Sequence, residues 1–265
     1  MLWTVIILGI VEGLTEFLPI SSTGHLILVG HWLQREGPYW SIFEVVIQVG
    51  AILAVVVEYR AMLFGMLLRP AEQKSRRLIV NLLAGFLPAA VLGFLFHDAI
   101  KTRLFGPRPV AVALIVGAIA MFIIERARPA ARTRSLAELS VGQSVAVGIA
   151  QCAALFPGFS RAAATILGGL LAGLDRPTAA QFSFLLAIPT LAGAAVLDLA
   201  KGAHGLTLVQ FEWMALGLVV SFFAAWAAIR WFIRYVSHHS LDVFALYRLL
   251  LGAMVLLLLG GLGTR

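Results

Sequence analysis

The sequence contains, near its amino terminus, the stretch Glu12-Gly-Leu-Thr-Glu16-Phe-Leu-Pro19-Ile-Ser21-Ser22-Thr23-Gly24-His25. This stretch places two carboxylates, three hydroxyls and an imidazole within sequence that is otherwise strongly apolar. Ionisable side chains are costly in the hydrocarbon of a membrane, so a cluster of them there indicates a functional site. The rest of the chain is expected to hold this cluster at depth and to supply it with a partner.

The composition around this stretch is that of a helical membrane protein. Of the 265 residues, 61% are hydrophobic and only 12% are charged, against roughly 25% in a soluble domain. Repeated apolar runs of about 18 residues or more predict membrane-spanning helices. The one cysteine, Cys152, excludes an internal disulfide and a cysteine-based metal site. The net charge of +7 comes from basic residues in short loops, which is the positive-inside pattern, so no nucleic-acid partner is expected.

Two parts of the chain are each expected to form a re-entrant helical hairpin, which dips into the membrane and returns. In the first part, residues 2–18 are apolar, Pro19 interrupts them, and a shorter apolar piece covers residues 26–33. In the second part, residues 141–156 and 162–174 flank the break Phe156-Pro157-Gly158-Phe159-Ser160-Arg161. Such a bend is tolerated only where it is buried in protein or lines a wet cavity. The alternative for the first part is one spanning helix followed by a surface loop.

The two halves of the chain share one plan. Six further segments are apolar enough to span a membrane, with basic loops at 60–78 and 126–140; the spans are 42–59, 79–97, 110–125, 182–200, 211–234 and 243–262. The halves also align at a fixed offset of 139 residues, which places Glu12 on Gln151, Phe17 on Phe156, Ser21 on Ser160, Ser22 on Arg161 and Phe43 on Phe182. These matches, together with the shared plan, predict an internal repeat.

The predicted fold is an all-α polytopic membrane protein with an inverted-topology repeat, each repeat being one re-entrant hairpin plus three transmembrane helices. Three crossings are an odd number, so the second repeat must be inserted upside down, with the site at the repeat interface. Residues 1–265 form one integral membrane domain, with repeat one at about 1–130 and repeat two at about 139–265. If the 60–78 loop lies on the inner side of the membrane, the loops on that side hold 12 Lys and Arg residues and the segments on the outer side hold six. This asymmetry agrees with the positive-inside pattern.

The two glutamates of the first break are placed for acid–base or metal chemistry. Glu12 and Glu16 lie four residues apart and share one face of a helix. Like charges repel at low dielectric, so either one carboxyl is protonated or a divalent cation, Mg²⁺ or Ca²⁺, lies between them. The alternative is a pair that faces water at a helix end. Gly9 and Gly13 form a GxxxG pair where another backbone can approach closely.

The hydroxyls of the first break include a candidate nucleophile. Ser21, Ser22 and Thr23 precede an apolar helical piece and are N-cap candidates; for Ser21, capping alone is expected. His25 lies three residues after Ser22, so on the first helical turn its imidazole could reach the hydroxyl. A serine beside a histidine base is the simplest activated nucleophile.

The second break supplies a cation. A buried Arg161 guanidinium needs an anion, which could be a carboxylate of the first break or a substrate phosphate bound in a bidentate manner. If the two breaks meet, two helix N-termini point at one place, which attracts phosphate. Thr165, one turn further on, would add a hydroxyl. The residues therefore predict a substrate with a phosphate head and an apolar tail. No phosphate loop of the G-x-x-x-x-G-K-[ST] type occurs, so ATP is not implied.

The two breaks resemble the paired signatures of the bacterial undecaprenyl-diphosphatase family, the bacitracin-resistance proteins. The segments Phe43-Glu-Val-Val-Ile-Gln48-Val-Gly and Phe182-Ser-Phe-Leu-Leu-Ala-Ile-Pro189 are also similar to family segments, so the resemblance covers nearly the whole chain. There is one departure: the family usually has Ser-Arg-Ser-Gly-Ala-Thr where this chain has Ser160-Arg161-Ala162-Ala163-Ala164-Thr165.

The resemblance implies an enzyme of the bacterial plasma membrane that hydrolyses undecaprenyl diphosphate to undecaprenyl phosphate and phosphate, recycling the lipid carrier for peptidoglycan synthesis. It implies that the active site opens to the outer, periplasmic side. It also implies roles for the quoted residues: Ser22 as nucleophile, His25 as base or later acid, Glu12 and Glu16 as acid/base or metal ligands, and Arg161 as phosphate ligand with Ser160, Thr23 and Thr165 nearby. Whether a divalent cation takes part is left open.

Two other functions remain open on the sequence alone. Broken helices in inverted repeats are also transporter architecture, so a transporter or flippase of a polyprenyl phosphate lipid is the first alternative. A non-catalytic membrane scaffold is the second. The expected partners are a polyprenyl diphosphate and membrane lipids, with a second copy of the chain as a candidate. Of the other polar residues, Glu44 and Gln48 are expected behind the first hairpin, and Asp198, Glu212 and Arg248 at helix ends or in structural pairs.

Overall fold

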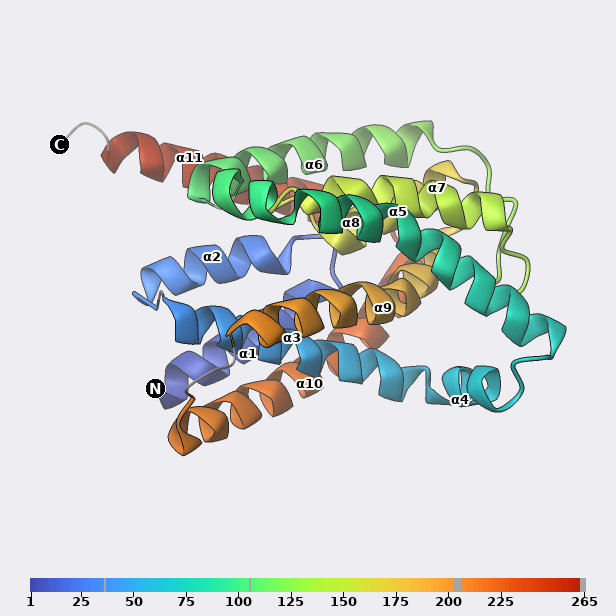
Figure 1. The fold of residues 1–265 in the computed structure, drawn as a ribbon. Helices are drawn as coiled ribbons and strands as arrows, with labels where there is room; N and C mark the ends of the chain where they lie inside the picture. Colours follow the sequence, from blue (N-terminus) through green and yellow to red (C-terminus); the bar gives the residue numbers. More distant parts are fainter. Residues whose placement is uncertain (36, 105, 203–205, 263–265) are drawn as a thin grey trace.

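The computed structural model describes residues 1–35, 37–104, 106–202 and 206–262 (Figure 1). Over these ranges the chain is helical, with one isolated backbone bridge between Thr133 and Leu174. Six of the described helices are long and apolar enough to cross a membrane. They are α3 (Pro38–Glu58), α5 (Gln73–Arg103), α6 (Pro107–Ala127), α9 (Arg176–Gly202), α10 (Leu208–Val236) and α11 (Asp242–Leu262). The predicted all-α polytopic fold and its six long helices are confirmed.

Two hairpins of short helices complete the bundle. The first pairs α1 (Leu2–Glu16) with α2 (Ser22–Trp32); the second pairs α7 (Val141–Gln151) and the short turn η1 (Cys152–Leu155) with α8 (Arg161–Leu171). In Figure 1, α1 and α2 occupy the end of the bundle that holds the amino terminus, while α7 and α8 occupy the opposite end. The chain therefore turns back at Pro19, as the hairpin interpretation predicted, and does not continue into a surface loop.

The bends of the two hairpins have the same local structure. Ser21 and Ser160 both adopt left-handed backbone angles, with φ of 75° and 77°. Each hydroxyl caps the following helix, accepting from Gly24 N at 3.2 Å and from Ala163 N at 3.1 Å. A non-glycine residue in this region is uncommon, and such strain gathers at functional sites. The bends lie 139 residues apart, which supports the inverted repeat; the repeat itself stays a prediction.

Close contacts at glycine residues hold the first helix of each hairpin against a long helix. A Cβ atom at Gly9 would lie 2.9 Å from the Gly217 carbonyl of α10, and one at Gly13 would lie 2.7 Å from Ala224 Cβ. On the second hairpin, a Cβ atom at Gly148 would overlap the Gly85 carbonyl of α5. The close approach predicted for the GxxxG pair is confirmed, because only glycine allows backbones to pack at this distance.

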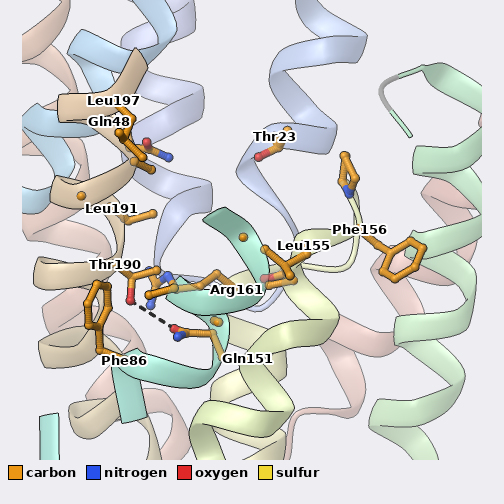
Figure 2. Close-up of a pocket in the computed structure, with 18 of the residues that line it drawn as sticks. Thr23, Gln48, Phe86, Gln151, Leu155, Phe156, Arg161, Thr190, Leu191 and Leu197 are labelled. Carbon is orange, nitrogen blue, oxygen red and sulfur yellow. Dashed lines mark hydrogen bonds between the residues drawn. The ribbon is translucent and has the colours of Figure 1, made fainter. Parts of the chain in front are cut away.

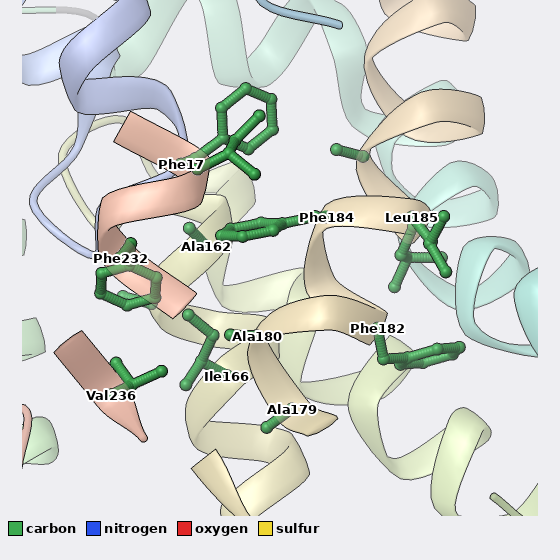
Figure 3. Close-up of a cluster of buried hydrophobic side chains, with 14 of the residues drawn as sticks. Phe17, Ala162, Ile166, Ala179, Ala180, Phe182, Phe184, Leu185, Phe232 and Val236 are labelled. Carbon is green, nitrogen blue, oxygen red and sulfur yellow. The ribbon is translucent and has the colours of Figure 1, made fainter. Parts of the chain in front are cut away.

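An aromatic core joins the bend of the first hairpin, at Phe17, to the second half of the chain (Figure 3). Phe17 and Phe184 meet edge to face with ring centroids 5.3 Å apart, and Phe184 and Phe232 are 6.0 Å apart. Ala162 of α8 belongs to the same buried cluster. This packing places the end of α1 beside the start of α8.

The predicted 60–78 loop is largely helical, which corrects the sequence analysis. The helix α4 (Arg60–Leu68) follows α3 after Tyr59 alone, and α5 begins at Gln73. Leu and Met have high helix propensity, so the basic residues at the ends of this segment do not prevent a helix. None of the residues of α4 is buried.

Candidate active site

A cavity of about 690 Å³ lies where the two bends meet (Figure 2). Its polar end is formed by the bends, and an apolar wall continues between α5 and α9. The polar lining residues from the bends are Glu16, Ser21, Ser22, Thr23, Ser160 and Arg161; the apolar wall includes Phe86, Phe94, Leu95, Leu155, Phe156, Leu191 and Leu197.

One carboxylate connects the two hairpins. Arg161 Nη2 donates to Glu16 Oε1 at 3.0 Å, and the side chains are 8% and 5% exposed. The Ser22 hydroxyl donates to the other carboxylate oxygen, Glu16 Oε2. The structure thus brings together Ser22, Glu16 and Arg161, and a carboxylate of the first break is the anion that Arg161 meets.

The guanidinium of Arg161 keeps further donor capacity. Its Nη1 donates to the Ser183 carbonyl at 2.9 Å, and it stacks over Phe17 with Cζ 5.6 Å from the ring centroid. Its Nε is buried and has no hydrogen-bond partner among the described residues. A buried donor left unsatisfied costs about 1–3 kcal/mol, so a ligand oxygen near this atom would be stabilised.

Thr165 lies behind Arg161 and does not line the cavity. It is fully buried, and its hydroxyl donates to the Arg161 carbonyl at 2.8 Å and pairs with the Ser183 hydroxyl at 2.6 Å. Sequence reasoning missed Ser183, which contacts both Arg161 and Thr165. The 139-residue offset could have found it, because it matches Ser183 to Glu44, next to the matched phenylalanines.

The imidazole of His25 faces α11 instead of Ser22. Its Nδ1 lies 2.7 Å from the Ser21 carbonyl and its Nε2 lies 2.6 Å from the Tyr247 hydroxyl, with the two rings stacked 5.6 Å apart. The expected approach of His25 to the Ser22 hydroxyl is therefore not found, because Glu16 takes that hydroxyl. Tyr247, which sequence reasoning missed, holds the imidazole from a helix 222 residues further along the chain.

Glu12 is buried beside the site and does not line the cavity. It is 1% exposed, and its Oε1 has no hydrogen-bond partner among the described residues. Its charged neighbours are Glu16, Glu44 and Arg161. The described side chains form no group of three or more His, Cys, Asp or Glu that could hold a metal ion. A cation here would have Glu12 and Glu16 as its protein carboxylates.

The family to which this architecture belongs is shown by comparison with known proteins. A family model described as "Bacitracin resistance protein BacA" matches residues 5–254. The chain belongs to the BacA family. Proteins named undecaprenyl-diphosphatase are similar over nearly their whole length: one from Herminiimonas arsenicoxydans is 48% identical (96% of this chain, 93% of the relative) and one from Nitrosomonas europaea is 48% identical (95% and 92%). The relative from Thermoanaerobacter pseudethanolicus is 47% identical (95% and 94%). The resemblance predicted from the two breaks is confirmed.

Within this BacA chain, the departure at residue 162 lies away from the cavity. Ala162 is fully buried in the aromatic cluster of Figure 3, on a different face of α8 from Arg161. Its methyl group packs on apolar neighbours, so the change to alanine leaves the Arg161 contacts in place.

Two amide side chains, those of Gln48 and Gln151, also line the cavity of this BacA chain. Thr190 donates to Gln151 Oε1 at 3.4 Å, and Gln48 lies further along the cavity (Figure 2). Gln151 matches Glu12 at the 139-residue offset. The second hairpin therefore presents a neutral amide at the position where the first hairpin has the Glu12 carboxyl.

Proposed function

We propose that this protein hydrolyses undecaprenyl diphosphate to undecaprenyl phosphate and phosphate, in the bacterial plasma membrane. The observation that carries the proposal is the hydroxyl–carboxylate–guanidinium contact of Ser22, Glu16 and Arg161 at the polar end of a cavity with an apolar wall. Its family relatives are named for this activity. A diphosphate head would lie at the bends and the prenyl chain along the wall.

The contacts suggest how a phosphoryl group would be transferred. The terminal phosphate would take the free Nε and one Nη donor of Arg161, which draws the guanidinium away from the Glu16 carboxylate. Glu16 then accepts the Ser22 proton as Oγ attacks the terminal phosphorus. The bond from that phosphorus to the bridging oxygen breaks, and undecaprenyl phosphate leaves. Water then attacks the phosphoserine and the bond from phosphorus to Ser22 Oγ breaks; Glu16 returns its proton to Oγ, and the released phosphate keeps the protons of the water.

The N-termini of α2 and α8 would stabilise the transferred group. Ser22 opens α2 and Arg161 opens α8, so free backbone N–H groups and the positive ends of both helices lie at the cavity. Such helix ends bind phosphate readily. His25 supports the bend from behind through the Ser21 carbonyl; acting as base would require it to release a partner.

Glu12 and Glu16 are the residues that would hold a Mg²⁺ or Ca²⁺ ion. Mg²⁺ is commonly bound by one or two carboxylates together with waters and substrate phosphates, and the unpartnered Glu12 oxygen suits that arrangement. When bound, the ion supplies charge neutralisation at phosphate oxygens.

We expect EDTA to lower the rate and Glu12→Gln to raise the Mg²⁺ concentration needed for half-maximal phosphate release. Glu138→Gln, in the 128–140 segment, is the control. Full activity after chelation would remove the metal and leave the hydrolase proposal standing.

A substitution in the apolar wall is expected to weaken binding of the prenyl chain without affecting binding of the diphosphate head. A Cβ atom at Gly193 would meet nothing within 4 Å, so a leucine there fits the helix and fills cavity space. We expect Gly193→Leu to raise KM for a long-chain lipid about tenfold, which corresponds to about 1.4 kcal/mol, with little effect on a short-chain prenyl diphosphate. The matched control is Gly65→Leu in α4, which also has open space but lies off the cavity. Equal effects on both substrates would contradict this placement of the tail.

The experiment that tests the function is phosphate release by the purified protein in detergent. A hydrolase releases phosphate from a short-chain prenyl diphosphate with no second compartment. A transporter or flippase releases none and instead moves labelled lipid between the leaflets of a vesicle. Absence of phosphate release by folded protein, with lipid movement present, would favour that alternative.

The cavity suggests that the site opens to the outer side of the membrane. It follows α5 from Phe86 to Leu95 and α9 from Thr190 to Asp198, toward the end of the bundle that holds the amino terminus. That end carries fewer basic residues, as expected for the outer side of the membrane.

On a Cys152→Ser background, we expect Leu208→Cys to react with an impermeant maleimide in intact cells and Leu68→Cys to react only after permeabilisation. Both leucines are exposed, at 83% and 78%, so the reverse pattern would place the opening inside.

A further inference from the structure

One arginine outside the site is completely buried. Arg248 of α11 is 0% exposed, and no described carboxylate pairs with it. The expectation that it lies at a helix end or in a structural pair is therefore wrong. A buried charge without a counter-ion is costly, so its place in the fold calls for a physical role.

The partners of Arg248 are backbone carbonyls of both bends. Its Nη1 donates to the Pro19 carbonyl at 3.1 Å, and its Nη2 donates to the Gly158 carbonyl at 3.3 Å. Pro19 precedes Ser22 by three residues, and Gly158 precedes Arg161 by three residues. The two carbonyls are also 139 residues apart, so one side chain binds the same position of each bend.

The guanidinium is also anchored to α6. Its Nη2 donates to the Ala113 carbonyl at 3.3 Å and its Nε to the Leu114 carbonyl at 3.4 Å. Gly117 provides the space, because a Cβ atom there would overlap Nη2. The rigid fork of an arginine can span four carbonyls, which the single ammonium of a lysine cannot do.

We propose that Arg248 is a positioning residue that holds the two hairpin bends at a fixed separation, so that Arg161 meets Glu16 and Ser22. The effect on rate rests on the proposed hydrolase function; the effect on geometry does not. Arg248 lines no part of the cavity, so it acts through the bends. A misplacement of about 1 Å in a catalytic constellation can cost about 100-fold in rate.

The test measures the distance between the bends and the rate in the same variants. Spin labels at Leu14→Cys and Ile149→Cys, on a Cys152→Ser background, report the separation of the two hairpins; both parent side chains are exposed and neither lines the cavity. The variants are Arg248→Gln, Arg248→Lys and Gly117→Ala. Gly252→Ala is the matched control, because its methyl group enters the same α6–α11 contact and meets Ile115 and Ala111, not the guanidinium.

We expect Arg248→Gln and Gly117→Ala to broaden the distance distribution and to lower kcat about 100-fold with a much smaller change in KM. Arg248→Lys should fall between these variants and the parent, and Gly252→Ala should keep the parent distribution. If Arg248→Gln does not fold, Gly117→Ala carries the test. A parent-like distribution in Gly117→Ala and Arg248→Gln would overturn the proposal, as would equal broadening in Gly252→Ala. The distance needs no substrate, so its outcome is separate from whether the protein hydrolyses a diphosphate.

Discussion

Ser22→Ala is expected to lower kcat for phosphate release by about 10⁴-fold or more, because it removes the only atom that forms the covalent intermediate in the proposed reaction. The Ser22 hydroxyl donates to Glu16 and lines the cavity, whereas the neighbouring Ser21 hydroxyl caps the following helix by accepting from Gly24 N. The measurement is kcat with a short-chain prenyl diphosphate in detergent. KM should change much less, because Arg161 and the helix ends remain.

The matched control for this variant is Ser221→Ala. Ser221 is also fully buried, but it lies on α10 against Gly13 and its hydroxyl has no partner among the described residues. Its removal should leave kcat unchanged. A rate for Ser22→Ala within about tenfold of the parent would reject Ser22 as nucleophile and make Glu16 the base for a directly attacking water.

A covalent intermediate provides an independent check. Protein mixed with substrate labelled in the terminal phosphate and quenched in acid should carry label on the peptide that contains Ser22. The Glu16→Gln variant should form less of it, since it lacks the carboxylate that receives the Ser22 hydrogen bond and is the proposed base.

Arg161→Ala is expected to lose both activity and stability. Removing one partner of a buried ion pair leaves the other charge uncompensated, which typically costs about 3–5 kcal/mol of unfolding free energy. Both side chains of this pair are less than a tenth exposed, so little screening by water applies. We also expect kcat/KM to fall about 10³-fold, because in the proposed reaction the guanidinium is the main phosphate ligand. Arg161→Lys keeps a positive charge without the bidentate fork and should recover more of the stability than of the activity.

The control for Arg161 is Arg176→Ala. Arg176 also pairs with a buried carboxylate, that of Glu125, but at the start of α9 and away from the cavity. Its loss should lower the thermal unfolding temperature in detergent while kcat/KM of the folded protein stays near the parent value. If Arg161→Ala behaved in the same way, losing stability alone, Arg161 would be a structural residue and not a phosphate ligand.

Most of the helical framework could be predicted from local sequence. Apolar runs of sufficient length form helices in a membrane because each backbone polar group must be satisfied within its own segment. Pro19, Pro157 and the small residues beside them interrupt those runs, so both hairpins are visible in the sequence. Helix α4 was missed because its basic ends suggested a loop, although its interior favours helix.

The members of the site could also be predicted, but their pairing could not. The sequence determined that Glu16, Ser22 and Arg161 would lie at breaks, because polar residues in apolar segments need partners. Which hydroxyl meets which carboxylate depends on how helices distant in the chain pack together. The tertiary structure therefore decided that Ser22 pairs with Glu16, that His25 turns to Tyr247, and that Thr165 lies behind Arg161.

Arg248 shows most clearly which features local sequence determines and which depend on the tertiary structure. Its position in an apolar helix could be read from the sequence, but not that its guanidinium reaches Pro19, 229 residues away, and Gly158, 90 residues away. Local sequence determines the helices and the bends because backbone hydrogen bonding and proline act on near neighbours. The meeting of the two bends is a long-range contact, set by glycine-mediated helix packing and a shared buried cation, so only the folded structure could reveal it.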